Sequence, residues 1–283
     1  MIDLSIIIVN YNGEKLLGDC LRSIYNSTGK ISFEIILVDN HSSDNSLRLV
    51  KEQFPRVTIL ENEENLGFCK ANNQGLKVYH GRYALLLNND TIVKEKALDR
   101  LVEFMDAHPG AGACGPKLLN PDGTVQHQGG IFARRFWLSP KPVTVNYLIA
   151  ACLLVRRTTI DQVGLLDENF FFSNDDLDYT RRIVKAGWKI YFVPQSEVVH
   201  LGGYTINLFR KEIFIEGFRG GLYFCKKHYG LIAYQLYRWL VVLLLLPAIL
   251  ITALAYPWLK NKEKLSAYIE ILRIFCKGES RRV

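Results

Sequence analysis

Three apolar runs, each typical of a buried strand, end directly in amide or carboxylate side chains. They are Leu4–Val9 before Asn10-Tyr11-Asn12, Phe33–Val38 before Asp39, and Tyr83–Leu87 before Asn88-Asn89-Asp90. The carboxyl ends of parallel strands meet at one edge of an open sheet, and ligands bind there. Oxygens at such an edge accept hydrogen bonds from a base and bind hard divalent cations. Any one of these side chains alone would more simply cap the following helix.

Two adjacent carboxylates follow the aromatic run 170–172 and begin a predicted helix over Asp176–Ala186. Asp175 lies beside Asp176, and a like-charged neighbour raises the pKa of a carboxyl group. A raised pKa suits a general base that takes a proton from an attacking hydroxyl near neutral pH. The alternative is that both acids only stabilise the first turn of the helix.

The segments around these groups alternate between strand-like and helical periodicity through residue 107. This alternation predicts an α/β fold with a Rossmann-like, doubly wound, mostly parallel sheet. The expected helices are Glu14–Ser27, Ser46–Phe54, about Lys70–Tyr79 and Lys94–Ala107, and the further strands are Val57–Leu60, Tyr147–Val155 and Trp188–Val193. Residues 110–146 are richer in Gly, Pro and Gln and show less periodicity.

Five motifs in this order resemble those of family 2 glycosyltransferases of the GT-A fold, and most closely the bacterial rhamnosyltransferase branch. The resemblance covers roughly residues 3–230. The five motifs are Ile8-Val9-Asn10-Tyr11-Asn12, Val38-Asp39-Asn40-His41-Ser42-Ser43-Asp44, Asn65-Leu66-Gly67-Phe68 with Asn72, Leu87-Asn88-Asn89-Asp90-Thr91, and Asp175-Asp176-Leu177-Asp178.

The resemblance implies transfer of a sugar from a nucleoside-diphosphate sugar to an acceptor hydroxyl, with inversion at the anomeric carbon. The family-level donor is dTDP-rhamnose, with UDP- and GDP-sugars as alternatives. Asp39 is then expected to bind the base and Asp176, with Asp175, to supply the general base. The remaining residues expected in the nucleotide-sugar site are Asn10, Tyr11, Asn12, Asn65, Gly67, Asn72, Asn88, Asn89 and Asp90.

The resemblance also implies a divalent cation, Mg²⁺ or Mn²⁺, that stabilises the departing diphosphate. The family's D-x-D motif is here Asn88-Asn89-Asp90, so that an amide replaces one carboxylate. We expect Asp90 and His200 as the metal ligands. A single histidine after a strand is otherwise an ordinary structural residue.

A C-terminal apolar segment lies between two basic flanks. Trp239–Leu259 has 21 residues without a charge, enough to reach about 30 Å as a helix. Because both flanks are rich in Lys and Arg, and because Pro247 should kink or break a helix, we expect a re-entrant or in-plane hairpin more than a single crossing. A buried core helix or a dimer interface is the alternative.

These observations divide the chain into a GT-A catalytic domain at 1–206 and a C-terminal membrane-association region at 207–283. We expect the nucleotide-sugar half of the catalytic domain at about 1–107 and the acceptor half at about 108–206. A site next to lipid favours a polyprenyl-diphosphate-linked glycan as acceptor, as in O-antigen assembly. Lys226, Lys227 and His228 are candidates to bind its diphosphate, or form an ordinary solvated face.

Composition excludes several other classes of protein. With 49% hydrophobic and 22% charged residues, the chain is globular rather than disordered. Its six cysteines form no C-x-x-C pair, so we expect neither a disulfide framework nor a zinc knuckle. The start of the chain lacks the basic residues of a secretory signal, and we expect the cytoplasmic face of the plasma membrane. The net charge of +7 gathers around the apolar run, which speaks against nucleic-acid binding.

Two other motif matches have simpler explanations. Gly110–Gly115 fits G-x-G-x-x-G but does not follow a strand, so we interpret it as chance. Gln235–Trp239 fits the Q-x-x-R-W motif of processive polysaccharide synthases, but one apolar segment cannot build a secretion channel. A processive-synthase-like subunit and a non-catalytic nucleotide-sugar-binding protein remain the alternative functions.

Overall fold

A computed structural model describes residues 2–27, 29–129, 134–202, 210–254 and 262–278. The chain forms two compact units, one from residues 1–167 and 176–204 and the other from 168–175 and 205–283. The last part of the predicted apolar run, residues 255–259, lies outside the described residues.

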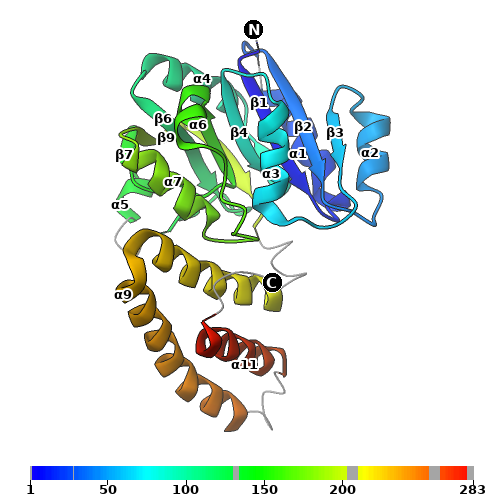
Figure 1. Ribbon diagram of the computed structural model, residues 1–283. Coiled ribbons are helices and arrows are strands. Elements are labelled where there is room, and N and C mark those ends of the chain that lie inside the picture. Colours follow the sequence, from blue (N-terminus) through cyan, green and yellow to red (C-terminus); the bar gives the residue numbers. More distant parts are fainter. Residues whose placement is uncertain (1, 28, 130–133, 203–209, 255–261, 279–283) are drawn as a thin grey trace. The chain divides into compact units, whose positions relative to one another are not determined.

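The larger unit alternates strands and helices (Figure 1). Its strands are β1 (Leu4–Asn10), β2 (Phe33–Asp39), β3 (Thr58–Glu61), β4 (Tyr83–Asn88), β5 (Thr91–Val93), β6 (Ala111–Leu119), β7 (Val143–Val145), β8 (Cys152–Arg156) and β9 (Lys189–His200). Its helices are α1 (Glu14–Ser27), α2 (Ser46–Gln53), α3 (Gly67–Val78), α4 (Ala97–Ala107), α5 (Arg134–Trp137), α6 (Arg157–Val163) and α7 (Asp175–Lys185). The first residue of α7, Asp175, is counted with the smaller unit, and the rest of the helix belongs to the larger one.

The described strands form one mixed sheet in the order β3-β2-β1-β4-β8-β6-β9-β5, with β7 beside β9. Strands β3, β2, β1 and β4 are parallel, as the sequence predicts, and β6 is parallel to β9. Strand β8 runs antiparallel to both β4 and β6. Its register pairs Leu87 with Cys152, so the beginning of β8 lies at the carboxyl end of β4.

Alternate side chains of the central strands face opposite layers of helices. Ile6 and Ile8 are fully buried in the main core, together with Leu21 of α1 and Leu101 of α4. Ile7 points the other way, because its side chain lies against Gly75 of α3. A continuous apolar run such as Leu4–Val9 is therefore explained by burial on both faces of the sheet.

The sequence did not predict the strand Ala111–Leu119, although it is central to the sheet. Gly115 and Pro116 suggest a turn, but Pro116 stands at an irregularity where β6 and β9 lose register. Strand β9 was expected to end at Pro194 and instead continues to His200, because residues 194–196 bulge out of the pairing. The bulge is held by the Ser196 hydroxyl, which donates to the carbonyl oxygen of Ala97 at 2.9 Å.

The described part of the smaller unit is mainly helical. Its long helix α9 (Arg210–Leu254) is broken at Gly230, whose φ of 81° is accessible to glycine at little cost. Pro247 was expected to kink or break the helix, but the helix continues through it to Leu254. The segment Lys211–Leu254 is long and apolar enough to cross a membrane by length and composition.

Helix α11 (Lys262–Lys277) packs against α9 around Leu222, Val241, Ile271 and Phe275. Arg238 closes the C-terminal end of α11, because its guanidinium donates to the carbonyl oxygens of Phe275 and Cys276. Tyr234 donates to the carbonyl oxygen of Gly278 at 2.9 Å. Unpaired carbonyl groups at a helix end need such partners. The arginine of the Q-x-x-R-W match therefore has a structural role.

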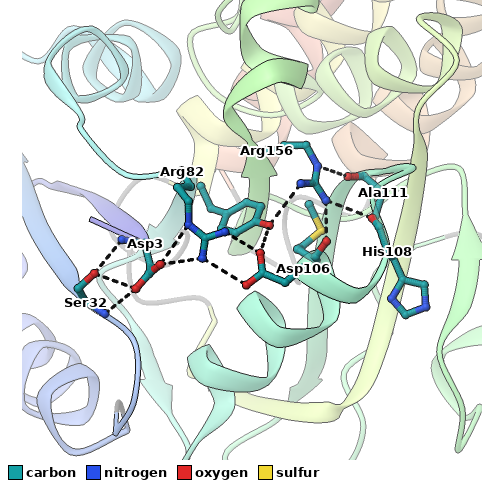
Figure 2. A network of polar contacts seen from close by, with 9 residues as sticks. Asp3, Ser32, Arg82, Asp106, His108, Ala111 and Arg156 are labelled. Carbon is teal, nitrogen blue, oxygen red and sulfur yellow. Dashed lines mark hydrogen bonds and ion pairs between the residues drawn. The ribbon is translucent and has the colours of Figure 1, made fainter. Parts of the chain in front are cut away.

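An ion-pair network ties the amino end of β1 to β4 and α4 (Figure 2). Arg82 contacts Asp3 and Asp106, in each case at 2.7 Å. Hydrogen bonds from Arg82 lower the pKa of Asp3 to about 2. Arg156 extends the network by donating to the carbonyl oxygens of Met105 at 2.7 Å and His108 at 3.1 Å.

We predict that Asp3→Asn lowers the free energy of unfolding at neutral pH by about 1 kcal/mol, since the pair with Arg82 is partly exposed. The folded-state pKa of Asp3 lies below its ordinary value of 3.8. The contribution of the Asp3 carboxylate to stability is therefore complete above pH 3.8 and disappears as the pH falls towards 2. Urea unfolding at neutral and acidic pH measures the difference. Asp19→Asn, which breaks an exposed pair with Arg22, should change stability by less than about 0.5 kcal/mol; an equal loss in both variants would contradict the prediction.

Candidate active site

Asn10, at the end of β1, joins the carboxyl ends of three neighbouring strands. Its fully buried amide nitrogen donates to Asp39 Oδ1 at 2.9 Å and to Ser46 Oγ at 2.9 Å. Its amide oxygen accepts a hydrogen bond of 2.9 Å from Asn89 Nδ2. Strands β1, β2 and β4 are adjacent in the sheet, so the polar residues after them meet at one edge.

Asp39 fixes the loop that follows β2. Its carboxylate accepts from the Ser42 hydroxyl at 2.6 Å and from the Ser42 backbone N–H at 2.8 Å. Asp39 thus holds this loop and does not cap helix α2, whose N-cap residue is Asn45. Each carboxylate oxygen has two lone pairs, so the group retains capacity for a further donor such as the N–H of a base.

The loops after β1 and β2 are linked to each other. Asn12 has a left-handed backbone with φ of 52°, and its side-chain oxygen accepts from the Ser43 backbone N–H at 2.8 Å. The Asn12 backbone N–H donates to Ser42 Oγ at 2.9 Å. Tyr11, the residue between Asn10 and Asn12, is half-buried. The expected base pocket therefore has a loop framework that its own polar groups fix.

Gly13 allows this arrangement and was not singled out from the sequence. A Cβ atom at this position would lie 2.3 Å from Asn10 Oδ1 and 2.4 Å from Asn89 Nδ2. These two atoms form the hydrogen bond between the side chains of Asn10 and Asn89, so any larger residue at position 13 would disturb it. A glycine directly after a polar strand end was the available signal.

The expected ribose and diphosphate residues divide into two groups. Asn65 accepts from the Gly67 backbone N–H at 3.0 Å, and the Gly67 carbonyl oxygen accepts from Asn40 Nδ2 at 3.1 Å. Both therefore connect to the end of β2. Asn72 is buried in α3 and donates to the carbonyl oxygen of Phe68, one turn earlier, at 3.0 Å.

Asp90 and His200 lie together, although 110 positions separate them in the chain. His200 Nε2 is 3.3 Å from Asp90 Oδ1 and 3.3 Å from Asn88 Nδ2. Strand β5 pairs Thr91 with His200, which explains why the end of β9 reaches the end of β4. Among the described residues, no three His, Cys, Asp or Glu side chains are arranged so that they could hold a metal ion together. A cation here would have one carboxylate and one imidazole from this chain.

The Asp176 carboxylate accepts hydrogen bonds from the Tyr147 hydroxyl and from nearby backbone amides. Tyr147 donates its hydroxyl proton to Asp176 Oδ2 at 2.8 Å, and the backbone N–H of Leu177 donates to Oδ1 at 2.7 Å. The backbone amide of Ala150 also donates to this carboxylate. Burial nevertheless outweighs these donors and raises the pKa of Asp176 above its ordinary value of 3.8. Tyr147, which the sequence analysis did not identify, orients the carboxylate.

A short backbone link connects Asp176 to the Asn88–Asp90 segment. The backbone N–H of Asn88 donates to the carbonyl oxygen of Ala151 at 3.0 Å. The residue before Ala151 is Ala150, whose backbone amide donates to the Asp176 carboxylate. The carboxylates of Asp39, Asp90 and Asp176 thus belong to one connected edge of the larger unit. The linked residues are Asn10, Asp39, Asn88, Asn89, Asp90, Asp176 and His200.

The remaining predicted residues belong to the smaller unit. Asp175 is buried, whereas Lys226 and Lys227 are exposed. Lys226 Nζ lies 5.6 Å from the centre of the Tyr234 ring, and Lys227 Nζ lies 5.9 Å from that of Phe170. The half-buried His228 ring lies 4.6 Å from Phe224, between ring centres.

Comparison with known proteins finds relatives that match more than half of this chain. The family model described as "Glycosyl transferase family 2" matches residues 5–164. The chain is 29% identical to the N-acetylglucosaminyl-diphospho-decaprenol L-rhamnosyltransferase of Mycobacterium tuberculosis, over 70% of this chain and 75% of that protein. It is 31% identical to the O-antigen biosynthesis protein RfbC of Myxococcus xanthus, over 69% of this chain but only 17% of that protein.

Solved structures agree on the fold. A crystal structure of GalNAc-T7 with UDP, GalNAc and Mn²⁺ is similar at a TM-score of 0.60 and 20% identity, over 71% of this chain and 43% of that one. A crystal structure of Staphylococcus aureus TarS residues 1–349 is similar at a TM-score of 0.62 and 17% identity, over 98% of this chain and 92% of that one. The GT-A fold expected from the sequence is confirmed.

We predict that Asp176→Asn raises the free energy of unfolding at neutral pH by about 1 kcal/mol. The raised pKa of Asp176 means that the folded protein binds this proton more tightly than the unfolded chain. Stability therefore falls as the pH rises above 3.8 through the folded-state pKa, and the asparagine variant avoids that loss. Thermal unfolding at several pH values should show that the stability gain of the Asp176→Asn variant becomes smaller as the pH falls.

The matched control is Asp178→Asn on the same helix, because buried Asp178 pairs with Arg182 at 2.9 Å. This variant should lose about 3 kcal/mol. A lower melting temperature for Asp176→Asn at neutral pH, or a difference that does not change with pH, would contradict the prediction.

Proposed function

The chain belongs to glycosyl transferase family 2 and is a glycosyltransferase, and from this premise we propose that it moves rhamnose from dTDP-rhamnose to a lipid-linked glycan. The observation that carries the proposal is the connected edge from Asp39 through Asn10 and Asn89 to Asp90, with Asp176 one backbone link away. The groups proposed to bind the nucleotide and the cation thereby come from strand ends, and the proposed general base comes from the start of α7. Rhamnose is favoured because the Mycobacterium relative is named as a rhamnosyltransferase.

In this proposal the base of the nucleotide donates a ring N–H to Asp39, beside Tyr11 and Asn12. Asn65, Gly67 and Asn72 lie along the ribose and diphosphate. Asn88 and Asn89 present amide groups to the sugar nucleotide. An uncharged amide does not repel the negative diphosphate as a carboxylate would.

Asp90 and His200 would hold the divalent cation. Asp90 Oδ1 and His200 Nε2 converge within 3.3 Å of each other, and a carboxylate oxygen and an imidazole nitrogen are both common metal ligands. When bound, a divalent cation supplies positive charge that stabilises the departing nucleoside diphosphate.

Asp176 would act as the general base. As the acceptor oxygen attacks the anomeric carbon, its proton passes to the Asp176 carboxylate, and the bond from that carbon to the diphosphate oxygen breaks. The burial that raises the pKa of Asp176 makes the carboxylate a stronger base near neutral pH. Tyr147 keeps the carboxylate oriented during the transfer.

The smaller unit suits a lipid-linked acceptor. An apolar depression of about 560 Å³ runs along α9 and is lined by Leu231, Ile232, Gln235, Leu236, Trp239, Leu240 and Leu243. The large apolar side chains of this stripe are more than half exposed, and the basic pair Lys226 and Lys227 precedes them on α9. Apolar and basic groups together favour binding to anionic lipid, on the cytoplasmic face where nucleotide sugars occur. Lys226, Lys227 and His228 would meet the acceptor's diphosphate.

We expect Asp176→Asn to lower kcat/KM for transfer about 10²- to 10⁴-fold and to leave the Kd for the nucleotide within about twofold. The assay uses a panel of nucleotide sugars and a polyprenyl-diphosphate-linked acceptor, with and without Mn²⁺. Asp161→Asn, on the exposed side of α6, is the control and should transfer at the wild-type rate. Unchanged turnover of Asp176→Asn would reject the base, and nucleotide binding by a wild type that transfers no sugar would favour a non-catalytic binding protein.

We further expect the full-length protein to sediment with vesicles that contain anionic phospholipid. Replacing Leu236, Leu240 and Leu243 with glutamine should lower the bound fraction about tenfold, since each exposed leucine would lose its contact with lipid. Val78→Gln with Leu138→Gln removes exposed apolar side chains of the larger unit and should leave binding unchanged. Equal loss in both sets would contradict the assignment of the stripe.

A further inference from the structure

Besides Asp90 and Asn88, His200 has a third partner, which contacts the other nitrogen of its ring. Its Nδ1 lies 2.8 Å from the side-chain oxygen of Gln126. Gln126 comes from the segment 110–146, whose sequence shows little periodicity. The imidazole is thus held between Gln126 on Nδ1 and the Asn88–Asp90 segment on Nε2.

The orientation of the Gln126 amide follows from a chain of hydrogen bonds. Gln126 Nε2 donates to Asn120 Oδ1 at 3.2 Å, and Asn120 Nδ2 donates to Thr124 Oγ1 at 2.9 Å. The Thr124 hydroxyl donates to Asp122 Oδ1 at 2.6 Å. We call these four residues, Asp122, Thr124, Asn120 and Gln126, the 120–126 chain.

The carboxylate of Asp122 sets the direction of every bond in the 120–126 chain. An ionised carboxylate only accepts, so Thr124 must donate its single hydroxyl proton to it. Thr124 can then only accept from Asn120, which must turn its NH₂ group towards Thr124 and its oxygen towards Gln126. Hydrogen bonds from the Thr124 hydroxyl and amide lower the pKa of Asp122, which keeps it ionised.

The 120–126 chain therefore ends in the side-chain carbonyl oxygen of Gln126, which is directed at His200 Nδ1. An oxygen without a proton requires that Nδ1 carry the hydrogen. In the neutral ring Nε2 then carries no hydrogen, and its lone pair can accept from Asn88 Nδ2 at 3.3 Å. The Asp90 carboxylate, 3.3 Å from Nε2, cannot donate to it, so both groups present lone pairs that suit a cation. A histidine ring nitrogen that binds a metal must be unprotonated.

The turn that carries the 120–126 chain is itself well held. The Asn120 backbone N–H donates to the Thr124 carbonyl oxygen at 2.8 Å, and the Gln126 backbone N–H donates to that of Leu118, in β6, at 2.8 Å. Leu119 and Val125 form an antiparallel bridge. These bonds attach Gln126 to the strand next to β9, which ends at His200.

We propose that Gln126 is a positioning residue, which fixes His200 as the Nδ1–H tautomer so that the Nε2 lone pair, beside Asp90, is offered to a divalent cation. This inference rests on the cation of the proposed function, but the tautomer itself is a property of the protein without substrate. It explains how a chain with an amide in place of one D-x-D carboxylate still presents a second ligand next to Asp90. Partners that fix the ring of a metal-binding histidine in this way commonly change metal affinity 10- to 100-fold.

The test is ¹⁵N NMR of the histidine rings in the full-length protein, at a pH where the rings are neutral. The sequence has six histidines, and the spectrum of His200→Gln identifies the His200 signals by their loss. We expect a protonated Nδ1 and an unprotonated Nε2 in the wild type. In Gln126→Leu the Nε2–H form should appear, and the affinity for Mn²⁺ alone, followed by water-proton relaxation, should fall about 10- to 100-fold.

Gln126→Glu is the matched variant, because a carboxylate keeps the acceptor for Nδ1–H; it should retain the tautomer and Mn²⁺ binding. The signals of the other five histidines report whether each variant is folded. A wild-type ring protonated on Nε2 would overturn the proposal even if sugar transfer proceeds. Wild-type tautomer and Mn²⁺ affinity in Gln126→Leu would also overturn it. Because no sugar substrate is present, a failure of the transferase assignment would leave these results unchanged.

Discussion

The site depends on one buried amide. Asn10 donates a hydrogen bond to the carboxylate of Asp39 in β2 and accepts one from the amide of Asn89, directly after β4. Both bonds form where three adjacent parallel strands end. A buried polar group without partners costs roughly 1–3 kcal/mol, so the loops around Asn10 are constrained to supply those partners. The same hydrogen bonds that stabilise the fold therefore hold the carboxylates of the site at fixed separations. Gly13 is part of this constraint, because a larger residue there would collide with both amides.

Two distant parts of the sequence complete the site by different means. Asp176 is brought in by the turn before β8, whose backbone bonds to Asn88 on one side and to the Asp176 carboxylate on the other. His200 is brought in by pairing of β9 with β5. In the proposed function, the position of the general base would therefore depend on a loop conformation, and that of the cation ligand His200 on strand register.

The sequence predicts the N-terminal half of the fold well, because buried parallel strands and amphipathic helices have distinct periodicities. Helix α1 begins and ends where expected, and Asp39 and Asp90 are found at the strand ends where ligand-binding groups belong. The prediction fails where tertiary contacts override local signals. Gly115 stands inside β6, where a Cβ atom would lie only 3.1 Å from the Cys152 carbonyl oxygen and from the Leu148 side chain. Pro116 and Pro194 stand inside strands because they lie at the irregularity where β6 and β9 lose register. Tyr147, Gly13 and Gln126 were missed since each acts through a neighbour distant in the sequence.

The bulge at 194–196 has a consequence for the length of this segment. Side chains alternate between the two faces of a strand, so insertion or deletion of one residue turns every later side chain to the opposite face. His200 lies on the far side of the bulge from the paired residues 189–193. Its access to Asp90 is therefore set by the number of residues between Val193 and Glu197 as much as by the imidazole itself. In relatives of this chain, gaps at this place should matter more than substitutions there.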